Sequence, residues 1–395
     1  MRKGWQEKQL GEFMEFKNGV NAAKEAYGHG VKFVNLMDIF KKPFLEKDDI
    51  SGSVDISPKQ ASEYSVQEGD ILFNRTSETP EEIACSSVYV GKEKITFGGF
   101  VIRGRQTKNL LIPSFAGYCF QSDQVRKSLI SKCQGVVRGN IGQKELSKVS
   151  ILVPPIAEQE KISAILSTWD EAIAKIEKIR SKKEQQIRHI RARLINKAEY
   201  ERKSIGSIAI EKSNRNRKNS VSRVLSVTNK SGFVLPEEQF QRRVASDDVS
   251  NYKIVQRGDY AYNPSRINVG SIARLDKHAD GILSPMYVTF SLDTNKINSD
   301  YFLNWLYSSE ARQRISQSAQ GSVRDTVGFS DLCSIKIPLP DLKTQNHIVE
   351  MLRTMETEIS TLQKKVIALK NQKRGLMQKL LTGAWPVTAS GKEAA

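Results

Sequence analysis

The chain has 395 residues, 39% of them hydrophobic, which is enough for two or three domains with real cores and excludes global disorder. Its net charge of +17 favours a polyanionic partner, most often nucleic acid, over the alternative of a merely soluble basic protein. The start of the sequence has no apolar core of signal-peptide length, and no apolar run approaches the roughly 20 residues that span a membrane. We therefore expect a cytoplasmic protein.

Neither the cysteines nor the histidines are spaced like metal ligands. The cysteines form no C-x-x-C pair, so we expect reduced thiols rather than disulfides or a zinc site. The histidines are equally isolated along the chain. These residues are Cys85, Cys119, Cys133 and Cys333, and His29, His189, His278 and His347. The sequence therefore predicts no bound metal.

Several segments recur along the chain at a nearly constant separation, which falls from 195 to 186 residues. The matching pairs are QLGEF (9–13) with SIGSI (204–208), VQEGDILFN (66–74) with VQRGDYAYN (255–263), QGVVRGNIGQKEL (134–146) with QGSVRDTVGFSDL (320–332), and ILVPPIAEQEKISAIL (151–166) with IPLPDLKTQNHIVEML (337–352). This pattern indicates duplication of a whole domain-plus-helix unit rather than a short solenoid repeat. The copies differ most between the matching segments, which is the ordinary consequence of an old duplication and is also expected of two readers of different targets.

Each globular half mixes short strands with helices. In the first half, ISGSVDIS, GDILFN, SSVYV and ITFGGFVI have strand character, with glycine and proline between them. A helix is predicted from Pro113 to about Lys132, and its counterpart begins where Asn298 or Ser299 can cap it. We expect an α+β fold with a twisted mixed or antiparallel sheet in each half.

Two long segments have apolar residues at alternating steps of four and three, which is coiled-coil spacing. In the first, the apolar positions are Ile162, Leu166, Trp169, Ile173, Ile176, Ile187, Ile190 and Leu194. In the second, they are Ile348, Leu352, Met355, Ile359, Leu362, Val366, Leu369, Leu376 and Leu380. Pairing of the two helices within one chain is favoured, while oligomerisation and packing on the globular domains remain alternatives.

If the helices pair within one chain, chain topology requires them to be antiparallel. About 40 residues at 1.5 Å each would then hold two globular domains roughly 60 Å apart, related by a pseudo-twofold axis. Such a spacer suits two DNA half-sites separated by unread base pairs. The predicted division of the chain is a first α+β domain at 1–153, a first helix at 154–199, a second domain at 200–339, a second helix at 340–384 and a flexible tail at 385–395.

Polar side chains that could reach base edges follow the matching strands GDILFN and GDYAYN. Arg103 and Arg105 leave a second strand, and NRNRK supplies basic residues of a kind that binds phosphates. Arg138 and Arg324 occupy matching positions, which favours a backbone contact or a structural ion pair. The full set of predicted DNA-binding residues is Asn74, Arg75, Thr76, Ser77, Arg103, Arg105, Arg138, Arg215, Arg217, Lys218, Tyr262, Asn263, Ser265, Arg266, Asn268 and Arg324.

Motifs for catalysis are missing from the sequence. There is no phosphate-binding G-x-x-x-x-G-K-[ST] loop, and NPSR at 263–266 lacks the second proline and the aromatic residue of the amino-methyltransferase motif. Asp70 and Asp259 follow glycines at matching turns and are interpreted as turn-formers. We infer a binding subunit without a cofactor of its own. A self-contained methyltransferase or nuclease, or a basic coiled-coil adaptor, is the alternative.

The repeated GDILFN strand, the LVPPIAEQEKI junction and the long helix resemble the specificity subunit of type I restriction-modification enzymes. The resemblance runs from LGEF near the start to LLTG at 380–383, although the second copy has TQNH where the first has EQEK. It implies two target recognition domains that each bind half of a split site in double-stranded DNA. It also implies two methyltransferase subunits, which carry S-adenosylmethionine and methylate adenine at N6, and a restriction subunit that can join. The junctions at 154–160 and 340–346 are then candidate partner surfaces.

Overall fold

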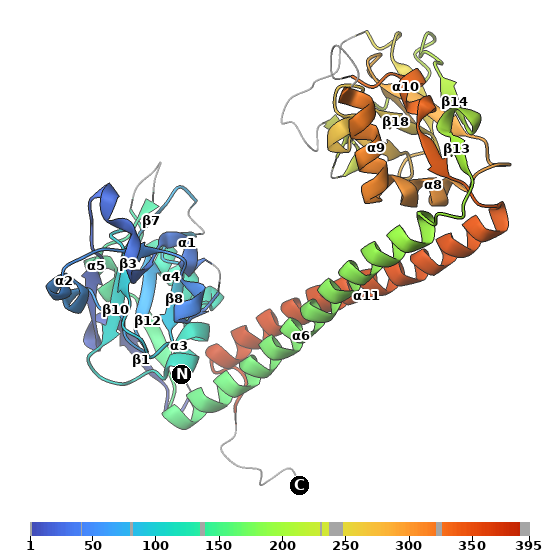
Figure 1. Ribbon diagram of the computed structural model, residues 1–395. Helices are drawn as coiled ribbons and strands as arrows, with labels where there is room; N and C mark the ends of the chain where they lie inside the picture. The colour runs from blue at the N-terminus through green and yellow to red at the C-terminus, as the bar shows by residue number, and fades with distance from the viewer. Residues whose placement is uncertain are drawn as a thin grey trace, which may run out of the picture. The chain divides into compact units, whose positions relative to one another are not determined.

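The computed structural model describes residues 2–40, 42–79, 82–134, 139–229, 231–236, 248–320 and 326–387 (Figure 1). Most of the predicted flexible tail, 388–395, lies outside these ranges. The chain divides into two compact units, Met1–Ile176 with Lys364–Ala395, and Glu177–Gln363. Each unit, called here unit 1 and unit 2, contains a globular part and a stretch of both long helices, α6 (Ile156–Ile195) and α11 (Leu342–Leu381).

Unit 1 is built on a five-stranded sheet in the order β2-β10-β6-β8-β4, antiparallel except for the parallel β4–β8 pair. Its strands are β2 (Met14–Asn18), β10 (Val101–Gln106), β6 (Ile71–Asn74), β8 (Ser86–Tyr89) and β4 (Phe44–Leu45). Smaller sheets pair β1 (Gln6–Gln9) with β12 (Ser150–Val153), β7 (Thr76–Ser77) with β11 (Gly139–Asn140), and β3 (Tyr27–Val34) with β5 (Ser53–Val54) and β9 (Thr96–Phe97). The helices are α1 (Leu36–Ile39), α2 (Pro58–Glu63), α3 (Pro113–Cys119), α4 (Asp123–Ser131) and α5 (Gln143–Ser147).

Unit 2 has a four-stranded antiparallel sheet in the order β14-β21-β18-β19. Its strands are β14 (Ala209–Lys212), β21 (Val288–Leu292), β18 (Tyr260–Tyr262) and β19 (Ile272–Arg274). Antiparallel pairs join β13 (Arg202–Ser204) to β22 (Lys336–Pro338), β15 (Ser226–Thr228) to β16 (Gly232–Val234), and β17 (Lys253–Gln256) to β20 (Asp280–Leu283). The helices are α8 (Ser299–Leu306), α9 (Ser309–Gln320) and α10 (Phe329–Ser334).

The two units repeat one strand order, which confirms the duplication. The order β2-β10-β6-β8 in unit 1 corresponds to β14-β21-β18-β19 in unit 2, and the repeated GD strand is central in both. The helix pair α3–α4 corresponds to α8–α9, and the pairing of β1 with β12 corresponds to that of β13 with β22. The mixed and antiparallel sheets agree with the predicted α+β class.

The helix predicted from Pro113 to Lys132 is interrupted. Ser122 ends the break between α3 and α4, and its side-chain oxygen accepts a hydrogen bond from the Val125 amide. Such N-capping starts a new helix direction. Unit 2 repeats the break, where the Ala311 amide donates to the Ser308 hydroxyl at 3.1 Å. The predicted cap at Asn298 is confirmed by hydrogen bonds from the amides of Asp300 and Tyr301 to its side-chain oxygen.

Within each unit, stretches of α6 and α11 run antiparallel and side by side (Figure 1). In unit 1, Lys373 of α11 pairs with Asp170 of α6. In unit 2, Lys183 and Arg191 of α6 form ion pairs at 2.7 Å with Glu358 and Glu356 of α11. The helix ends also enter the domain cores, through Ile162 and Leu166 in unit 1 and Ile348 and Leu352 in unit 2. Both intrachain pairing and packing on the domains therefore occur.

The described ranges contain no helix long and apolar enough to cross a membrane, and no cluster of three or more histidine, cysteine or acidic residues that could hold a metal ion. None of the four cysteines forms a disulfide. Burial raises the pKa of the Cys119 thiol to about 12, so it stays protonated and behaves as a small core residue.

Candidate nucleic-acid interface

The strand tip of unit 1 is shaped by the side chains that follow β6. Buried Asn74 donates from Nδ2 to the Glu82 carbonyl at 2.9 Å and accepts from the Thr76 amide at 3.0 Å. The Ser77 hydroxyl donates to the Glu82 carboxylate at 2.8 Å. The sequence predicted that Asn74 and Ser77 bind DNA; in the structure both side chains are buried and hold the turn together. Arg75 and Thr76 remain half-exposed at the tip.

Arg103 is buried in unit 1, and Arg105 beside it is half-buried. The Arg103 guanidinium donates to the Ser65 carbonyl at 2.5 Å and lies 5.7 Å from the centre of the Phe97 ring. Burial, together with neighbouring Arg105, lowers the pKa of Arg103. Arg105 makes two hydrogen bonds to the buried carboxylate of Asp70, and these raise the pKa of Arg105. The sequence predicted that both arginines contact DNA; in the structure Arg103 is buried and Arg105 is half-buried, and each binds a group of unit 1.

The matching aspartates Asp70 and Asp259 form turns, as predicted. Asp70 accepts a hydrogen bond from the Gln67 amide at 2.9 Å, and Asp259 accepts one from the Gln256 amide at 2.8 Å. Both carboxylates are buried, and each has a cation beside it, which is Arg105 for Asp70 and Lys212 for Asp259. The turn is therefore common to both copies, while the cation comes from different strands.

In unit 2, β18 ends in a tip of a different shape. Tyr262, which the sequence predicted to bind DNA, is fully buried against Phe290. The Asn263 side-chain oxygen accepts a hydrogen bond from the Ser265 amide at 3.0 Å and so bends the chain into the turn η6 (Ile267–Val269). Gly270 ends this turn at φ +89°, a backbone conformation that favours glycine. Ser265, Arg266 and Asn268 are exposed there.

One wall of a cleft of about 620 Å³ is formed by Ser265, Arg266 and Asn268, at and just before η6. The hairpin β15–β16 supplies the other wall. Lining residues from this hairpin and from the approach to β21 are Ser226, Thr228, Asn229 and Tyr287. The walls are tied together, since the Ser271 hydroxyl donates to the Val227 carbonyl at 2.9 Å. The cleft is therefore a preformed site that offers hydroxyl, amide and guanidinium groups.

Sequence reasoning missed the hairpin wall of this cleft. Thr228 and Asn229 lie more than 30 positions before Arg266 and follow no strand that recurs in unit 1. The pairing of β15 with β16 brings them to the cleft. The one available signal was the polar run TNKSG at 228–232, which is typical of a hairpin turn.

The basic loop at 213–221 is anchored by Asn216. This buried side chain donates to the Val221 carbonyl at 2.8 Å and accepts from the Val221 amide at 3.2 Å. Arg217 and Lys218 are exposed on the loop, and the Arg215 guanidinium donates to the Asn251 carbonyl at 3.0 Å. The loop thus presents two basic side chains from a fixed base.

Arg138 and Arg324 lie outside the described residues. The segments that follow them meet the strand tips at equivalent atoms. The Ile141 amide donates to the Arg75 carbonyl at 3.0 Å, and the Val327 amide donates to the Pro264 carbonyl at 3.1 Å. The repeated segment therefore supports the tip in both units.

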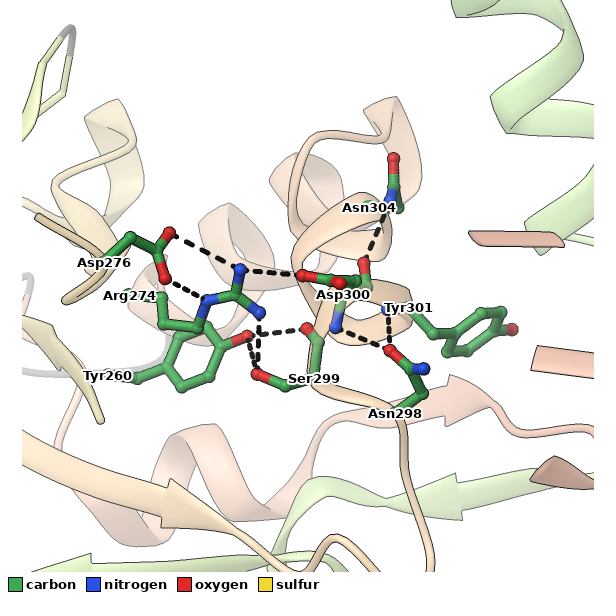
Figure 2. Close-up of polar contacts among 8 residues, drawn as sticks. All are labelled: Tyr260, Arg274, Asp276, Asn298, Ser299, Asp300, Tyr301 and Asn304. Carbon is green, nitrogen blue, oxygen red and sulfur yellow. Dashed lines mark hydrogen bonds and ion pairs between the residues drawn. The ribbon is translucent and has the colours of Figure 1, made fainter. Parts of the chain in front are cut away.

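Arg274, on the strand next to the unit 2 tip, is neutralised by an internal network that Figure 2 shows. It forms ion pairs at 2.7 Å with Asp276 and with Asp300, and donates to the Ser299 hydroxyl at 2.9 Å. The buried Tyr260 hydroxyl donates to the Ser299 carbonyl at 2.8 Å (Figure 2). This network fixes the sheet to the start of α8.

A buried glutamine joins each domain to its long helix. Gln159 donates to the carbonyls of Leu110 and Pro154 at 2.7 and 2.8 Å and accepts from the Ile112 amide at 3.0 Å. Gln345, 186 positions later, repeats all three bonds, with the carbonyls of Pro340 and Lys296 at 2.7 and 3.2 Å and the Asn298 amide at 2.8 Å. The glutamine shared by EQEK and TQNH therefore links the domain to the long helix in both units. Comparison of the two sequences had not identified this role.

Around these glutamines the junctions differ in charge but share one exposed feature. The Glu158 carboxylate forms an ion pair with Arg2 and accepts a hydrogen bond from the Trp5 indole N–H. Asp341 instead caps α11 by accepting a hydrogen bond from the Thr344 amide. The first residues of the two helices, Ile156 and Leu342, are aliphatic and 43% and 36% exposed. Both junctions therefore present an exposed aliphatic side chain, even though the neighbouring charges differ.

Comparison with known proteins matches this architecture. The family described as Type I restriction modification DNA specificity domain matches residues 2–186 and 240–371. The putative type I restriction enzyme MjaX specificity subunit of Methanocaldococcus jannaschii is 25% identical over 412 residues, with 96% of this chain and 93% of that protein covered. The MjaVIII specificity subunit of the same organism is 24% identical, with 96% of this chain and 92% of that protein covered.

Solved structures show the same fold. The HsdS subunit from Thermoanaerobacter tengcongensis superposes with a TM-score of 0.52 at 17% identity, over 98% of both chains. A chain from a structure described as the basis of complex assembly and conformational transition of the type I R-M system gives a TM-score of 0.64 at 13% identity, over 96% of this chain and 98% of that chain. The resemblance predicted from the sequence is confirmed, and the chain belongs to the family of type I restriction-modification DNA specificity subunits.

Proposed function

We propose that this chain is the DNA-recognition subunit of a type I restriction-modification assembly and reads a bipartite site, with one half-site for each unit. One observation carries the proposal: equivalent strands, β6 and β18, end in tips that are supported alike but expose different side chains. Unit 1 offers Arg75 and Thr76, and unit 2 offers the polar cleft beside η6. A common scaffold with unlike tips suits two half-sites of different sequence.

The residue types at the tips are those that discriminate bases. Arginine donates two hydrogen bonds to guanine, and asparagine pairs in the same way with adenine in the major groove. Arg266 and Asn268 are exposed on one cleft wall and suit this task. Arg217 and Lys218, on the anchored loop, suit phosphate contacts that position the duplex.

We further propose that the chemistry belongs to partners. Two methyltransferase subunits, each with S-adenosylmethionine, would methylate adenine at N6, and restriction subunits would join the same cytoplasmic assembly. The exposed Ile156 and Leu342, at equivalent positions in two junctions, support two copies of one partner. The apolar side chains would then provide each contact with the partner, and the different charges beside them would adjust its strength.

The direct test measures binding of the full chain to duplex DNA by fluorescence anisotropy, after selection from a pool of random duplexes. We expect enrichment of two fixed sequence blocks and an affinity that falls as salt rises, since phosphate contacts release counterions. Enrichment of no sequence would favour the adaptor alternative. Binding of S-adenosylmethionine by the chain alone would favour a self-contained methyltransferase.

A variant series at the cleft separates base reading from phosphate binding. Arg266→Ala should lose about 1–3 kcal/mol of discrimination in the second half-site only, and Arg266→Lys should keep the salt dependence but not the discrimination. Arg257→Ala is the matched control, since this exposed arginine lies before β18 rather than after it. An equal loss on every sequence would show that Arg266 is a phosphate contact.

A further inference from the structure

The two units share a β-turn that the sequence repeat does not reveal. In unit 1, the Val101 amide donates to the Gly98 carbonyl at 2.8 Å, which closes a turn just before β10. In unit 2, the Tyr287 amide donates to the Ser284 carbonyl at 3.0 Å and closes a turn before β21. The turn sequences are GGFV and SPMY and have no residue in common.

Strand register shows that these turns are equivalent. Ile102 of β10 pairs with Phe73 of β6, and Val288 of β21 pairs with Tyr262 of β18. Phe73 and Tyr262 occupy the same place in the repeated GD strand, so Ile102 corresponds to Val288. Phe100 lies two residues before Ile102, and Met286 lies two residues before Val288. Phe100 and Met286 are therefore equivalent, and each is the third residue of its turn.

Both of these third residues are apolar and exposed, at 62% for Phe100 and 58% for Met286. A single exposed apolar side chain is ordinary on a protein surface. Here the exposure recurs at one turn position in two copies that have diverged around it. Both copies have an apolar residue at this position although their turn sequences differ. This indicates that a binding partner, rather than water, covers the side chain.

Each turn lies beside the strand tip to which we assign base reading. The Arg75 amide donates to the Phe100 carbonyl at 2.9 Å, so this turn is bonded to the unit 1 tip. Tyr287, the residue after Met286, lines the cleft of unit 2, and its hydroxyl accepts a hydrogen bond from the Val227 amide. The exposed apolar group is therefore at the rim of each candidate interface.

We propose that Phe100 and Met286 each place an apolar side chain against the bases of their own half-site. This inference rests on the proposed function and adds two specificity-determining residues to it. In the grooves of a duplex, an apolar side chain has two kinds of partner, the methyl group of thymine and the faces of a base step that it partly unstacks. Both are buried from water on contact, and both depend on the base sequence.

The test uses the full chain and a duplex that carries its selected site. Phe100→Ala should weaken binding about tenfold and change preference in the first half-site only, and Met286→Ala should do the same in the second. Phe100→Leu should restore most of the affinity, since it keeps an apolar group. Ile210→Ala is the control, because Ile210 is 60% exposed on β14, where it pairs with Ser291, five residues beyond Met286.

Two DNA substitutions identify the partner atom. Replacing thymine by uracil removes one methyl group and should cost roughly fourfold in affinity if that methyl is the contact. A rise in 2-aminopurine fluorescence on binding, absent with the alanine variant, would instead identify an opened base step. The inference is overturned if the alanine variants bind and select DNA as the wild type does, or lose affinity equally on all sequences. Failure of the wild type to select any sequence would overturn the proposed function itself.

Discussion

Replacement of Gln345 by alanine should loosen the junction between the second domain and α11. Its side chain is fully buried and makes three hydrogen bonds, to two carbonyls and from the Asn298 amide. Each buried backbone group that loses its hydrogen bond to Gln345 costs about 1–3 kcal/mol. Partial relaxation of the surrounding structure offsets some of the summed cost. We therefore expect Gln345→Ala to lower the free energy of unfolding of unit 2 by about 2–4 kcal/mol.

The measurement is chemical unfolding combined with hydrogen exchange of segment 296–306, which contains the Asn298 amide. Gln363→Ala is the control, since Gln363 is exposed on the same helix and its loss should change stability by less than about 0.5 kcal/mol. Gln345→Glu keeps the size but places a carboxylate against two carbonyls, and it should be at least as destabilising at neutral pH. Equal unfolding and equal exchange for the variants at 345 and 363 would refute the assigned role.

Three further predictions concern the core, a helix cap and the partners. Asp70→Ala removes the partner of Arg105 and should destabilise unit 1 by about 3–5 kcal/mol in chemical unfolding, while Glu68→Ala, an exposed position of the same turn, should have little effect. The Thr344 amide holds the pKa of Asp341 below its usual value. The stability that the Asp341 carboxylate contributes is therefore full above about pH 4 and is lost as pH falls through the lowered pKa. Asp341→Asn should flatten this part of the profile of unfolding free energy against pH, and an unchanged profile would contradict the assignment. Ile156→Asp and Leu342→Asp should each remove one methyltransferase subunit from the assembly in mass measurements of the complex, whereas loss of both partners from a single change would contradict two separate junction sites.

The repeat and the long helices could be predicted because their signals are periodic and local. Steps of four and three identify α6 and α11, and matched glycines identify the central strands β6 and β18. The break between α3 and α4 was harder to predict, because apolar residues continue through it. Its one local signal is Ser122, a capping residue that is also common in loops.

The sequence did not show which polar side chains face a second layer of the fold. All four residues of β6 and the first four residues of β10 are buried, so both faces of these strand segments are covered. Asn74 of β6 and Arg103 of β10 are therefore buried, and no sequence pattern distinguishes them from exposed residues such as Arg266. The hairpin wall of the unit 2 cleft was missed for a related reason, since pairing of β15 with β16 brings it there.

In the proposed function, this chain selects a bipartite DNA site for partner methyltransferases. Mapping of N6-methyladenine across the genome, in cells with the partner subunits and with or without this chain, tests it most directly. We expect two short sequence blocks at a fixed separation that are methylated only when the chain is present, and a change confined to the second block with Arg266→Ala. Methylation that persists without the chain, or a variant that alters both blocks alike, would contradict this account.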